Sequence, residues 1–304
     1  MIASSLSAAT RGTPRVALVT CHELPDLDPD DRLLIEPLRA RGVRTEAVAW
    51  DDPAADWAGY DLAVLRSPWD YVPRRAEFLA WARTVPALAN PAGIVEWNTD
   101  KRYLAELAAA GVPVVPTGWL SPGDPPWAAP AEGEYVVKPA ISAGSADTGR
   151  YDLGDPEHRV LAQRHAARLR TAGRVTMVQP YLPAVDSYGE TALLYLGGRY
   201  SHAIRKGPLL DGPDVGMDGL YRPEEISARE PSPAEREVAE DIMGKVPGRT
   251  DLLYARVDLI PGPDGAPLLI ELELTEPSLF LGYARGAATR LADAIVARLG
   301  ARCS

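Results

Sequence analysis

The chain has 304 residues, 46% of them hydrophobic and 24% charged, which is ordinary for a globular protein with one large domain or two to three subdomains. Its net charge of −10 argues against nucleic acid or an anionic membrane as a partner, and no apolar run reaches the roughly 18 residues of a membrane span. The two cysteines, Cys21 and Cys303, fit neither a disulfide framework nor a zinc site, so we expect a cytoplasmic protein.

Residues 15–97 are expected to form a small parallel α/β unit, after a disordered tail at 1–14 that lacks the apolar core of a signal peptide. Pro37 is expected to kink or shorten the first helix. The turn after the first strand has no glycine-rich fingerprint, which argues against dinucleotide binding. The alternating segments are strands at 15–20, 43–50 and 61–67 and helices at 28–42 and 73–84.

Ligands of open α/β sheets bind beyond the carboxyl ends of the strands. This rule nominates the polar side chains that follow the first and third strands as substrate contacts. Arg66 is the strongest of them, because a guanidinium directly after an apolar strand suits a carboxylate or a phosphate. An exposed loop position is the alternative for His22. The nominated residues are His22, Glu23, Arg66, Asp70 and Tyr71.

The next segment, residues 98–182, carries two lysines at notable positions. Asn98 is expected to cap a helix, which places Lys101 in its first turn, where a cation is unfavourable unless Asp100 or a bound phosphate compensates it. Lys138 ends a strand at 134–138 and precedes a loop of small residues, a kind of loop that lets backbone N–H groups close over phosphates. A helix at about 156–171 and a strand ending at 179–182 follow.

Two hairpins are predicted in the C-terminal third. In the first, Gly197 and Gly198 form the turn, and the resulting register puts Glu190 opposite Arg205, either as a plain ion pair or in a functional role. Residues 207–231 are rich in Gly, Pro and Asp and are expected to form a mobile loop. Helices are expected at about 232–246 and 285–300.

The second hairpin, at 252–275, turns at Asp264 and Gly265. Its register pairs Asp258 with Glu271 and Arg256 with Glu273. Alternation of side chains then puts these four residues on one face and Ile270, Leu272 and Leu274 on the other. Because three carboxylates this close repel one another, we expect a cation among them, and oxygen ligands suit Mg²⁺. The alternative is a solvated face with an Arg–Glu pair.

Taken in order, these features resemble the ATP-grasp ligases from about residue 15 to 300. The resemblance implies an α/β (α+β) fold in which ATP is enclosed between two α+β subdomains. An N-terminal parallel α/β subdomain on the substrate side would span 15–97, a central lid subdomain 98–182, and a C-terminal subdomain with the metal site 183–304. Residues 207–231 and the small-residue loop are the candidates for a lid that excludes water.

The same resemblance implies roles for individual residues. ATP would be bound by Lys101, Lys138, Ser142, Gly144, Ser145, Gln179, Pro180, Tyr181, Leu182 and Asp186. Two Mg²⁺ ions would be held by Asp258, Glu271 and Glu273, and the transferred phosphoryl group by Arg256, Arg205 and Lys206. Two departures stand out: Glu273 replaces the usual Asn, and the loop that follows, which contacts substrate in the family, contains Glu276 and Ser278 and no glycine.

Three stretches, CHELPDLDPDDRL, LRSPWDY and WNTDKRYL, are most similar to the D-cycloserine synthetases. That similarity implies a cyclo-ligase of antibiotic biosynthesis, which activates the carboxylate of O-ureido-D-serine as an acyl phosphate and closes the ring. Arg66 and Arg256 would bind the substrate carboxylate, and Glu23, Asp70 or Glu276 its ammonium group. An intermolecular carboxylate–amine ligase and a non-catalytic nucleotide-binding protein stay open as alternatives, as does a homodimer.

Overall fold

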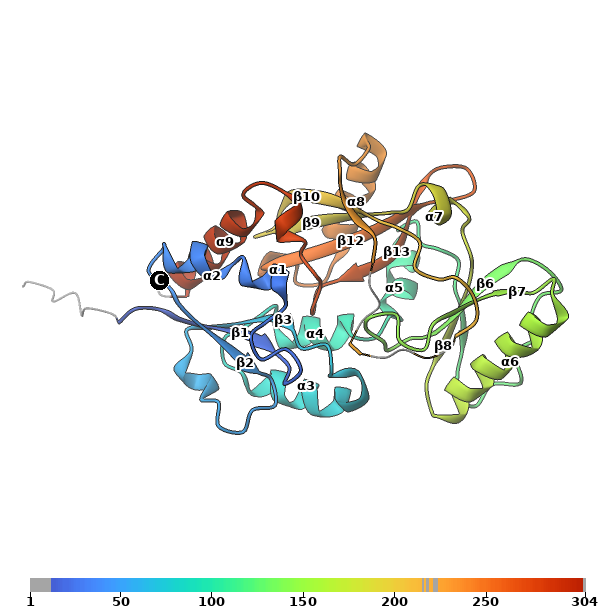
Figure 1. The fold of residues 1–304 in the computed structure, drawn as a ribbon, viewed down its shortest axis with the longest axis horizontal. Helices are drawn as coiled ribbons and strands as arrows, with labels where there is room; N and C mark the ends of the chain where they lie inside the picture. Colours follow the sequence, from blue (N-terminus) through green and yellow to red (C-terminus); the bar gives the residue numbers. More distant parts are fainter. Residues whose placement is uncertain (1–11, 215, 217–218, 221–223, 303–304) are drawn as a thin grey trace, which may run out of the picture.

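The structure is a computed structural model that describes residues 12–214, 216, 219–220 and 224–302. The chain forms three sheets that follow one another along its long axis (Figure 1). Most of the predicted tail, together with Cys303, lies outside the described residues. Within the described part, no helix combines the length and the apolar character needed to cross a membrane.

The N-terminal sheet has the order β2-β1-β3-β4 and is parallel throughout, as the sequence predicts. Its strands are β1 (Arg15–Thr20), β2 (Arg44–Ala49), β3 (Leu62–Ser67) and β4 (Leu88–Ala89). Its helices are α1 (Pro29–Arg32), α2 (Ile35–Arg39), α3 (Arg75–Thr84) and α4 (Ala92–Asn98). The single helix expected at 28–42 is two short ones, because the Pro37 ring excludes the carbonyl of Leu33, the residue that caps the C-terminus of α1.

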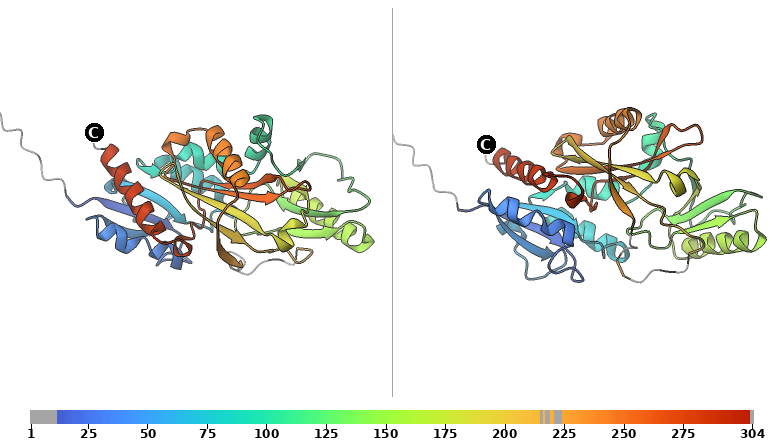
Figure 2. Two further views of the ribbon diagram at one scale, coloured as in Figure 1. Left: turned by 90° about the horizontal axis from the view of Figure 1, so that it is seen from above. Right: turned by 45° about the horizontal axis from the view of Figure 1, so that its top comes forward.

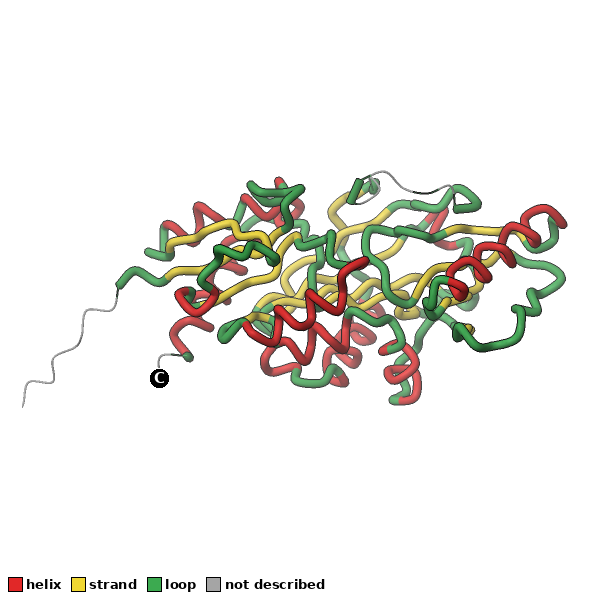
Figure 3. The backbone as a smooth tube through the Cα atoms, turned by 90° about the horizontal axis from the view of Figure 1, so that it is seen from below, coloured by secondary structure: helices red, strands yellow, loops and turns green. Residues whose placement is uncertain are grey.

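The central sheet has the order β5-β8-β6-β7, with antiparallel neighbours. It is built from β5 (Gly118–Leu120), β6 (Glu134–Pro139), β7 (Gly149–Asp152) and β8 (Thr176–Pro180). Helix α6 (Pro156–Thr171) packs on it and begins at Asp155, whose side chain accepts hydrogen bonds from two backbone N–H groups. This unit lies at one end of the molecule (Figure 3).

The C-terminal sheet has the order β11-β10-β9-β12-β13 and is antiparallel. Its strands are β9 (Glu190–Leu196), β10 (Arg199–Lys206), β11 (Ile226–Arg229), β12 (Tyr254–Pro261) and β13 (Pro267–Glu273), and its helices are α7 (Ala184–Ser187), α8 (Pro233–Lys245) and α9 (Ala287–Ala301). The prediction of a loop throughout 207–231 is wrong at β11, which pairs with the edge of β10. Residues 215, 217–218 and 221–223 of that stretch lie outside the described residues.

A continuous core joins the N-terminal and C-terminal sheets. Leu291 and Ile295 of α9 belong to the same apolar cluster as Leu18 of β1 and Leu194 of β9, and Figure 2 shows α9 between the two sheets. Helix α5 (Tyr103–Ala109) likewise packs against the C-terminal sheet. The central sheet and α6 have a smaller cluster of their own, so the central unit is the one held less tightly to the rest.

Candidate active site

A cavity of about 510 Å³ is lined by residues of all three units. The N-terminal unit contributes the start of α1 and the segment after β3, the central unit contributes β6, the loop after it and the end of β8, and the C-terminal sheet contributes all five of its strands. The polar residues that line it include Asp28, Asp30, Tyr71, Lys101, Lys138, Ser142, Gln179, Glu190, Lys206, Glu224, Arg256, Glu271, Glu273, Glu276 and Ser278.

The hairpin of β12 and β13 pairs Asp258 with Glu271 and Arg256 with Glu273, as predicted. The predicted turn is nevertheless wrong by one position. The loop has three residues and ends at Gly265, whose φ of +82° suits glycine, and the pairing shifts by one residue between Asp258 and Leu259. This shift restores the predicted pairing of Asp258 with Glu271 and of Arg256 with Glu273.

The same irregularity moves Ile270 out of the face predicted for it. Leu272 and Leu274 are buried in the core, but Ile270 lines the cavity and packs with Leu182, Val185 and Ile260. An apolar wall of this kind beside the end of β8 suits a flat aromatic ring.

The predicted pairing of Glu190 with Arg205 is wrong. A register shift between Tyr200 and His202 brings Lys206 opposite Glu190 instead. The Lys206 Nζ atom lies 3.3 Å from both Glu190 Oε2 and Asp258 Oδ2. Arg205 does not line the cavity, and its Nε donates to the Tyr188 carbonyl at 2.9 Å. The structure therefore favours Lys206 over Arg205 as the cation of this strand.

Lys206→Ala and Arg205→Ala form a matched test of this assignment. We expect Lys206→Ala to lower kcat about 100-fold or more, because it removes a cation aimed into the cavity. Arg205→Ala should change kcat less than about threefold. Steady-state ADP release measures both, with thermal melting as the check on folding. A larger loss for Arg205→Ala would contradict the assignment.

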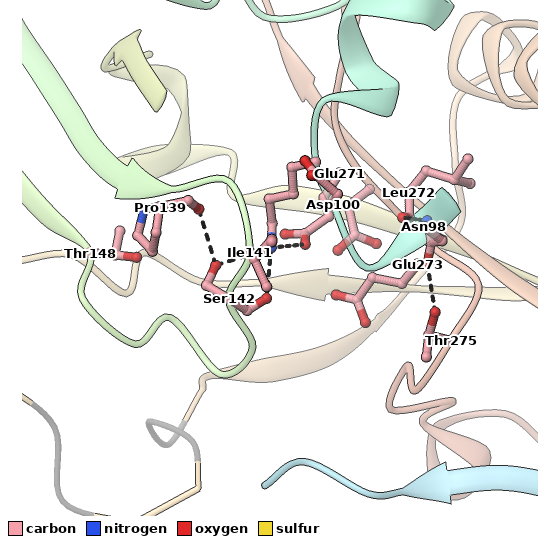
Figure 4. Close-up of polar contacts among 12 residues, drawn as sticks. Asn98, Asp100, Pro139, Ile141, Ser142, Thr148, Glu271, Leu272, Glu273 and Thr275 are labelled. Atoms are coloured by element: carbon pink, nitrogen blue, oxygen red, sulfur yellow. Dashed lines mark hydrogen bonds and ion pairs between the residues drawn. The ribbon is translucent and has the colours of Figure 1, made fainter. Parts of the chain in front are cut away.

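Lys101 lies between two helices, because α4 ends at Asn98 and α5 begins at Tyr103. The expectation that Asn98 caps a helix is therefore wrong. The Asn98 amide instead donates to the Leu272 carbonyl and accepts from the Leu274 N–H, both at 2.7 Å, and so completes the free edge of β13 (Figure 4). Hydrogen bonds to this edge strand outweigh the local capping preference.

The two predicted phosphate-binding lysines meet at the cavity. Lys101 Nζ donates to the Ser142 carbonyl at 2.8 Å and lies 3.2 Å from Glu271 Oε1, and Figure 4 shows Ser142 and Glu271 approaching one point. Burial lowers the pKa of Lys138, against the opposing effect of Glu271. Positive φ angles at Gly144 and Ser145 fold the small-residue loop that follows Lys138 tightly at the cavity wall.

Four of the residues predicted to bind ATP, Gln179, Pro180, Tyr181 and Leu182, line the cavity together at the end of β8. Asp186 does not. It lies in α7, accepts a hydrogen bond from the Tyr181 hydroxyl at 2.5 Å and pairs with Arg150 at 3.3 Å. The Asp186 carboxylate, which was expected to bind ATP, is thus engaged by Tyr181 and Arg150, whereas the acidic Glu190 does line the cavity.

The three predicted metal ligands are not equivalent. Glu271 and Glu273 line the cavity, whereas Asp258 is fully buried and does not. Asp258 Oδ1 lies 2.8 Å from Arg256 Nε, and Arg256 also contacts Glu273. Within the described ranges, no three acidic, His or Cys side chains are grouped as a metal site. Asp258 is occupied by ion pairs with Arg256 and Lys206, and the three-carboxylate site stays a prediction.

Two carboxylates still fit one divalent cation. Burial raises the pKa of Glu273, and the nearby charges of Glu271 and Asp258 raise it further, against Arg256. Burial also opposes ionisation of Glu271, but Lys101 and Lys138 outweigh it and lower that pKa. A bound cation would favour the ionised form of Glu273, and Mg²⁺ commonly binds one or two carboxylates together with phosphate oxygens.

Of the substrate residues predicted in the N-terminal unit, only Tyr71 lines the cavity. Arg66 is fully buried, 3.0 Å from Asp31 Oδ1. Asp70 accepts hydrogen bonds from Trp50 and Arg74, both at 2.8 Å. His22 and Glu23 are exposed outside the cavity. None of these four side chains lines the cavity in this structure, so their substrate roles stay predictions. For Arg66 the reason is that the chain after β13 covers the end of β3, where the Pro277 carbonyl accepts a hydrogen bond from Arg66.

The two substrate residues predicted after β13, Glu276 and Ser278, do line the cavity. Burial raises the pKa of Glu276 to about 7, although its hydrogen bond with the Tyr71 hydroxyl lowers it. Sequence reasoning missed Glu224, whose carboxylate lies 3.6 Å from Lys206, and the start of α1 with Asp28. In the sequence, Asp28 is distinguished only as a helix N-cap that precedes a proline, and that pattern carries no information about the cavity.

Comparisons with known proteins agree with this geometry. The family described as "D-cycloserine synthetase DcsG, N-terminal domain" matches residues 16–92. The cycloserine biosynthesis protein DcsG of Streptomyces lavendulae is 39% identical over 301 residues, covering 93% of this chain and 98% of that protein.

Solved structures extend the likeness. The crystal structure of D-cycloserine synthetase DcsG matches with a TM-score of 0.82 and 38% identity, over 94% of this chain and 99% of that one. The ATP-grasp ligase PsnB, solved with Mg and ADP, shares the fold with a TM-score of 0.58 at 19% identity, over 95% and 99% of the two chains. The chain therefore belongs to the DcsG family of D-cycloserine synthetases and has the ATP-grasp ligase fold.

Proposed function

We propose that the protein is an Mg-ATP-dependent cyclo-ligase that converts O-ureido-D-serine to D-cycloserine. The observation that carries the proposal is the meeting of Lys101, Lys138, Lys206 and Arg256 with two metal-competent carboxylates in one cavity, in a chain 39% identical to a cycloserine biosynthesis protein. Three lysines and an arginine beside a pair of carboxylates that can hold Mg²⁺ suit a triphosphate, because the cations and the metal together neutralise its charge.

In this proposal the nucleotide spans the cavity. The base lies against Ile260 and Ile270, near the end of β8, and the phosphates lie between Lys101 and Lys138. Glu271 and Glu273 would hold Mg²⁺, which neutralises charge on the phosphates when it is bound. The support is the position of these residues along one cavity wall and the Mg-ADP complex known for PsnB.

Three steps make up the proposed reaction. The substrate carboxylate takes the γ-phosphoryl group from ATP, which gives an acyl phosphate and ADP. The nitrogen bonded to the ureido oxygen then attacks the acyl carbon, loses its proton and expels phosphate. Loss of the carbamoyl group consumes one water and yields carbon dioxide and ammonia. The chain's part is to align carboxylate and nitrogen, since a unimolecular closure gains several kcal/mol from proximity.

An intermolecular carboxylate–amine ligase would use the same nucleotide residues, so the acceptor distinguishes the two functions. Addition of a tenfold excess of D-alanine should leave cycloserine formation unchanged if closure is intramolecular. A product with the mass of a dipeptide, formed in place of cycloserine, would establish the intermolecular function. ATP binding without ADP release across a panel of amino acids would favour a non-catalytic protein.

A further inference from the structure

Five consecutive carbonyl groups after β13 are each held by a side chain from another part of the fold. No regular secondary structure runs through residues 275–279, yet the segment is pinned at every residue. The contacts are Thr275 with Tyr254 Oη at 2.9 Å, Glu276 with Trp69 Nε1 at 3.0 Å, Pro277 with Arg66 Nη2 at 2.5 Å, Ser278 with Arg256 Nη1 at 3.2 Å and Leu279 with His202 Nε2 at 3.0 Å.

These hydrogen bonds explain why Arg66 is buried, and they give it a structural role in place of the predicted contact with substrate. Its guanidinium pairs with Asp31 at 3.0 Å and lies over the Tyr254 ring, 4.8 Å from the ring centroid, while donating to the Pro277 carbonyl. A loop fixed in this way loses little conformational entropy on binding and presents its side chains in one geometry. The side chains that it presents to the cavity are Glu276 and Ser278.

The charges of the cavity single out Glu276. Four of the acidic residues that line it have a cationic partner: Glu190 and Glu224 lie beside Lys206, Glu271 beside Lys101, and Glu273 beside Arg256. The remaining pair, at the start of α1, accepts hydrogen bonds from backbone N–H groups: Asp28 from Asp30, and Asp30 from Leu281 and Gly282.

Glu276 differs from all of these. Its hydrogen-bond partner is the hydroxyl of buried Tyr71, and among the residues that the structure describes it forms no ion pair within 4.0 Å. A carboxylate in a partly dry cavity with a single neutral partner is costly unless a cation joins it. The rigid loop therefore presents to the cavity a carboxylate that no Lys, Arg or His in the described part of the chain pairs with directly.

We propose that Glu276 recognises the α-ammonium group of the substrate and so makes the enzyme selective for amino acids. The inference rests on the proposed function, because it assumes a zwitterionic substrate in this cavity. Tyr71 positions the Glu276 carboxylate. Arg256 donates to the Ser278 carbonyl two residues on and also contacts Glu273, so the reacting carboxylate of the substrate would lie near Glu273 and the phosphoryl donor.

The test compares O-ureido-D-serine with its desamino analogue, 3-(ureidooxy)propanoate, by calorimetric titration into the Mg-ADP enzyme, which needs no turnover. The wild type should bind the amino compound about 10- to 100-fold more tightly, as expected for a charge-assisted hydrogen bond. Glu276→Gln should abolish that preference and leave the Kd for Mg-ADP unchanged. Glu276→Asp, which keeps the charge, should retain part of the preference for the amino compound. The exposed control Glu237→Gln should retain all of that preference.

Two failures are distinguishable. Equal binding of the two compounds by the wild type, or an undiminished preference in Glu276→Gln, would overturn the role of Glu276 whatever the reaction is. Wild-type enzyme that binds the amino compound selectively yet forms no cycloserine would refute the proposed function and leave the ammonium site standing.

The pH dependence gives a second readout. The ammonium group binds the ionised carboxylate, and burial raises the pKa of Glu276 to about 7, so kcat/KM for O-ureido-D-serine should rise as the pH passes through about 7. The charged groups around Glu276 are Lys101, Glu271 and Arg256, with Tyr71 as its hydrogen-bond partner. Glu276→Gln should lack this rise. A wild-type profile identical to that of the variant would contradict the assignment.

Discussion

Glu271→Gln should lower kcat by about 100- to 1,000-fold while the protein stays folded. The carboxylate of Glu271 lines the cavity, lies 3.2 Å from Lys101 and stays ionised because Lys101 and Lys138 lower its pKa against the effect of burial. The amide of Gln keeps the shape but loses the charge that binds Mg²⁺ and orients Lys101, and removal of one charge-stabilising group costs on the order of 3–4 kcal/mol in the transition state. Steady-state ADP release gives kcat.

A magnesium titration separates a metal role from a purely structural one. Loss of a ligand should raise the Mg²⁺ concentration required for half-maximal activity by about 10-fold or more. The exposed Glu237→Gln removes the same charge outside the cavity and should change neither value. Unchanged kcat and unchanged Mg²⁺ dependence in Glu271→Gln would show that the hairpin face is only an ion-pair surface.

Asp258→Asn should lower the free energy of unfolding by about 3–5 kcal/mol, because breaking a buried ion pair leaves its partners without a countercharge. Asp258 is fully buried, and both the Arg256 guanidinium and the Lys206 ammonium contact it, at 2.8 Å and 3.3 Å. If Asp258 were instead a carboxylate crowded by Glu271 and Glu273 alone, its removal would stabilise the chain.

Urea unfolding at constant pH measures this difference. Asp293→Asn is the matched control, because its carboxylate pairs with Arg41 at 2.7 Å with a side chain that is 61% exposed. Exposed pairs contribute about 1 kcal/mol or less. An effect of Asp258→Asn no larger than that of Asp293→Asn would contradict the buried cluster and return Asp258 to a metal-ligand role.

The elements of the fold could largely be predicted from local pattern. Strands β1 and β3 are short apolar runs, and α6 begins at an Asp-Pro pair that fixes its first turn. The acidic hairpin face was also predictable, since alternation decides which side chains share a face once the pairing of Asp258 with Glu271 is correct.

The errors in the site come from features that turn residues and spacing do not encode. One shift of register near Ser201 exchanged Arg205 for Lys206, and another near Ile270 moved that residue into the cavity. Arg66 was assigned to substrate because nothing local reveals that a segment more than 200 residues later covers it. The side chains at the ends of strands could be named, but which of them the C-terminal loop buries depends on tertiary packing.

The nucleotide and cycloserine products of one incubation test the central claim most directly. With Mg-ATP and O-ureido-D-serine, the account predicts one D-cycloserine, one ADP and one phosphate for each substrate molecule consumed, measured by mass spectrometry and ion-exchange chromatography. Formation of AMP and pyrophosphate would contradict activation through an acyl phosphate, and ADP release without any cycloserine would contradict ring closure.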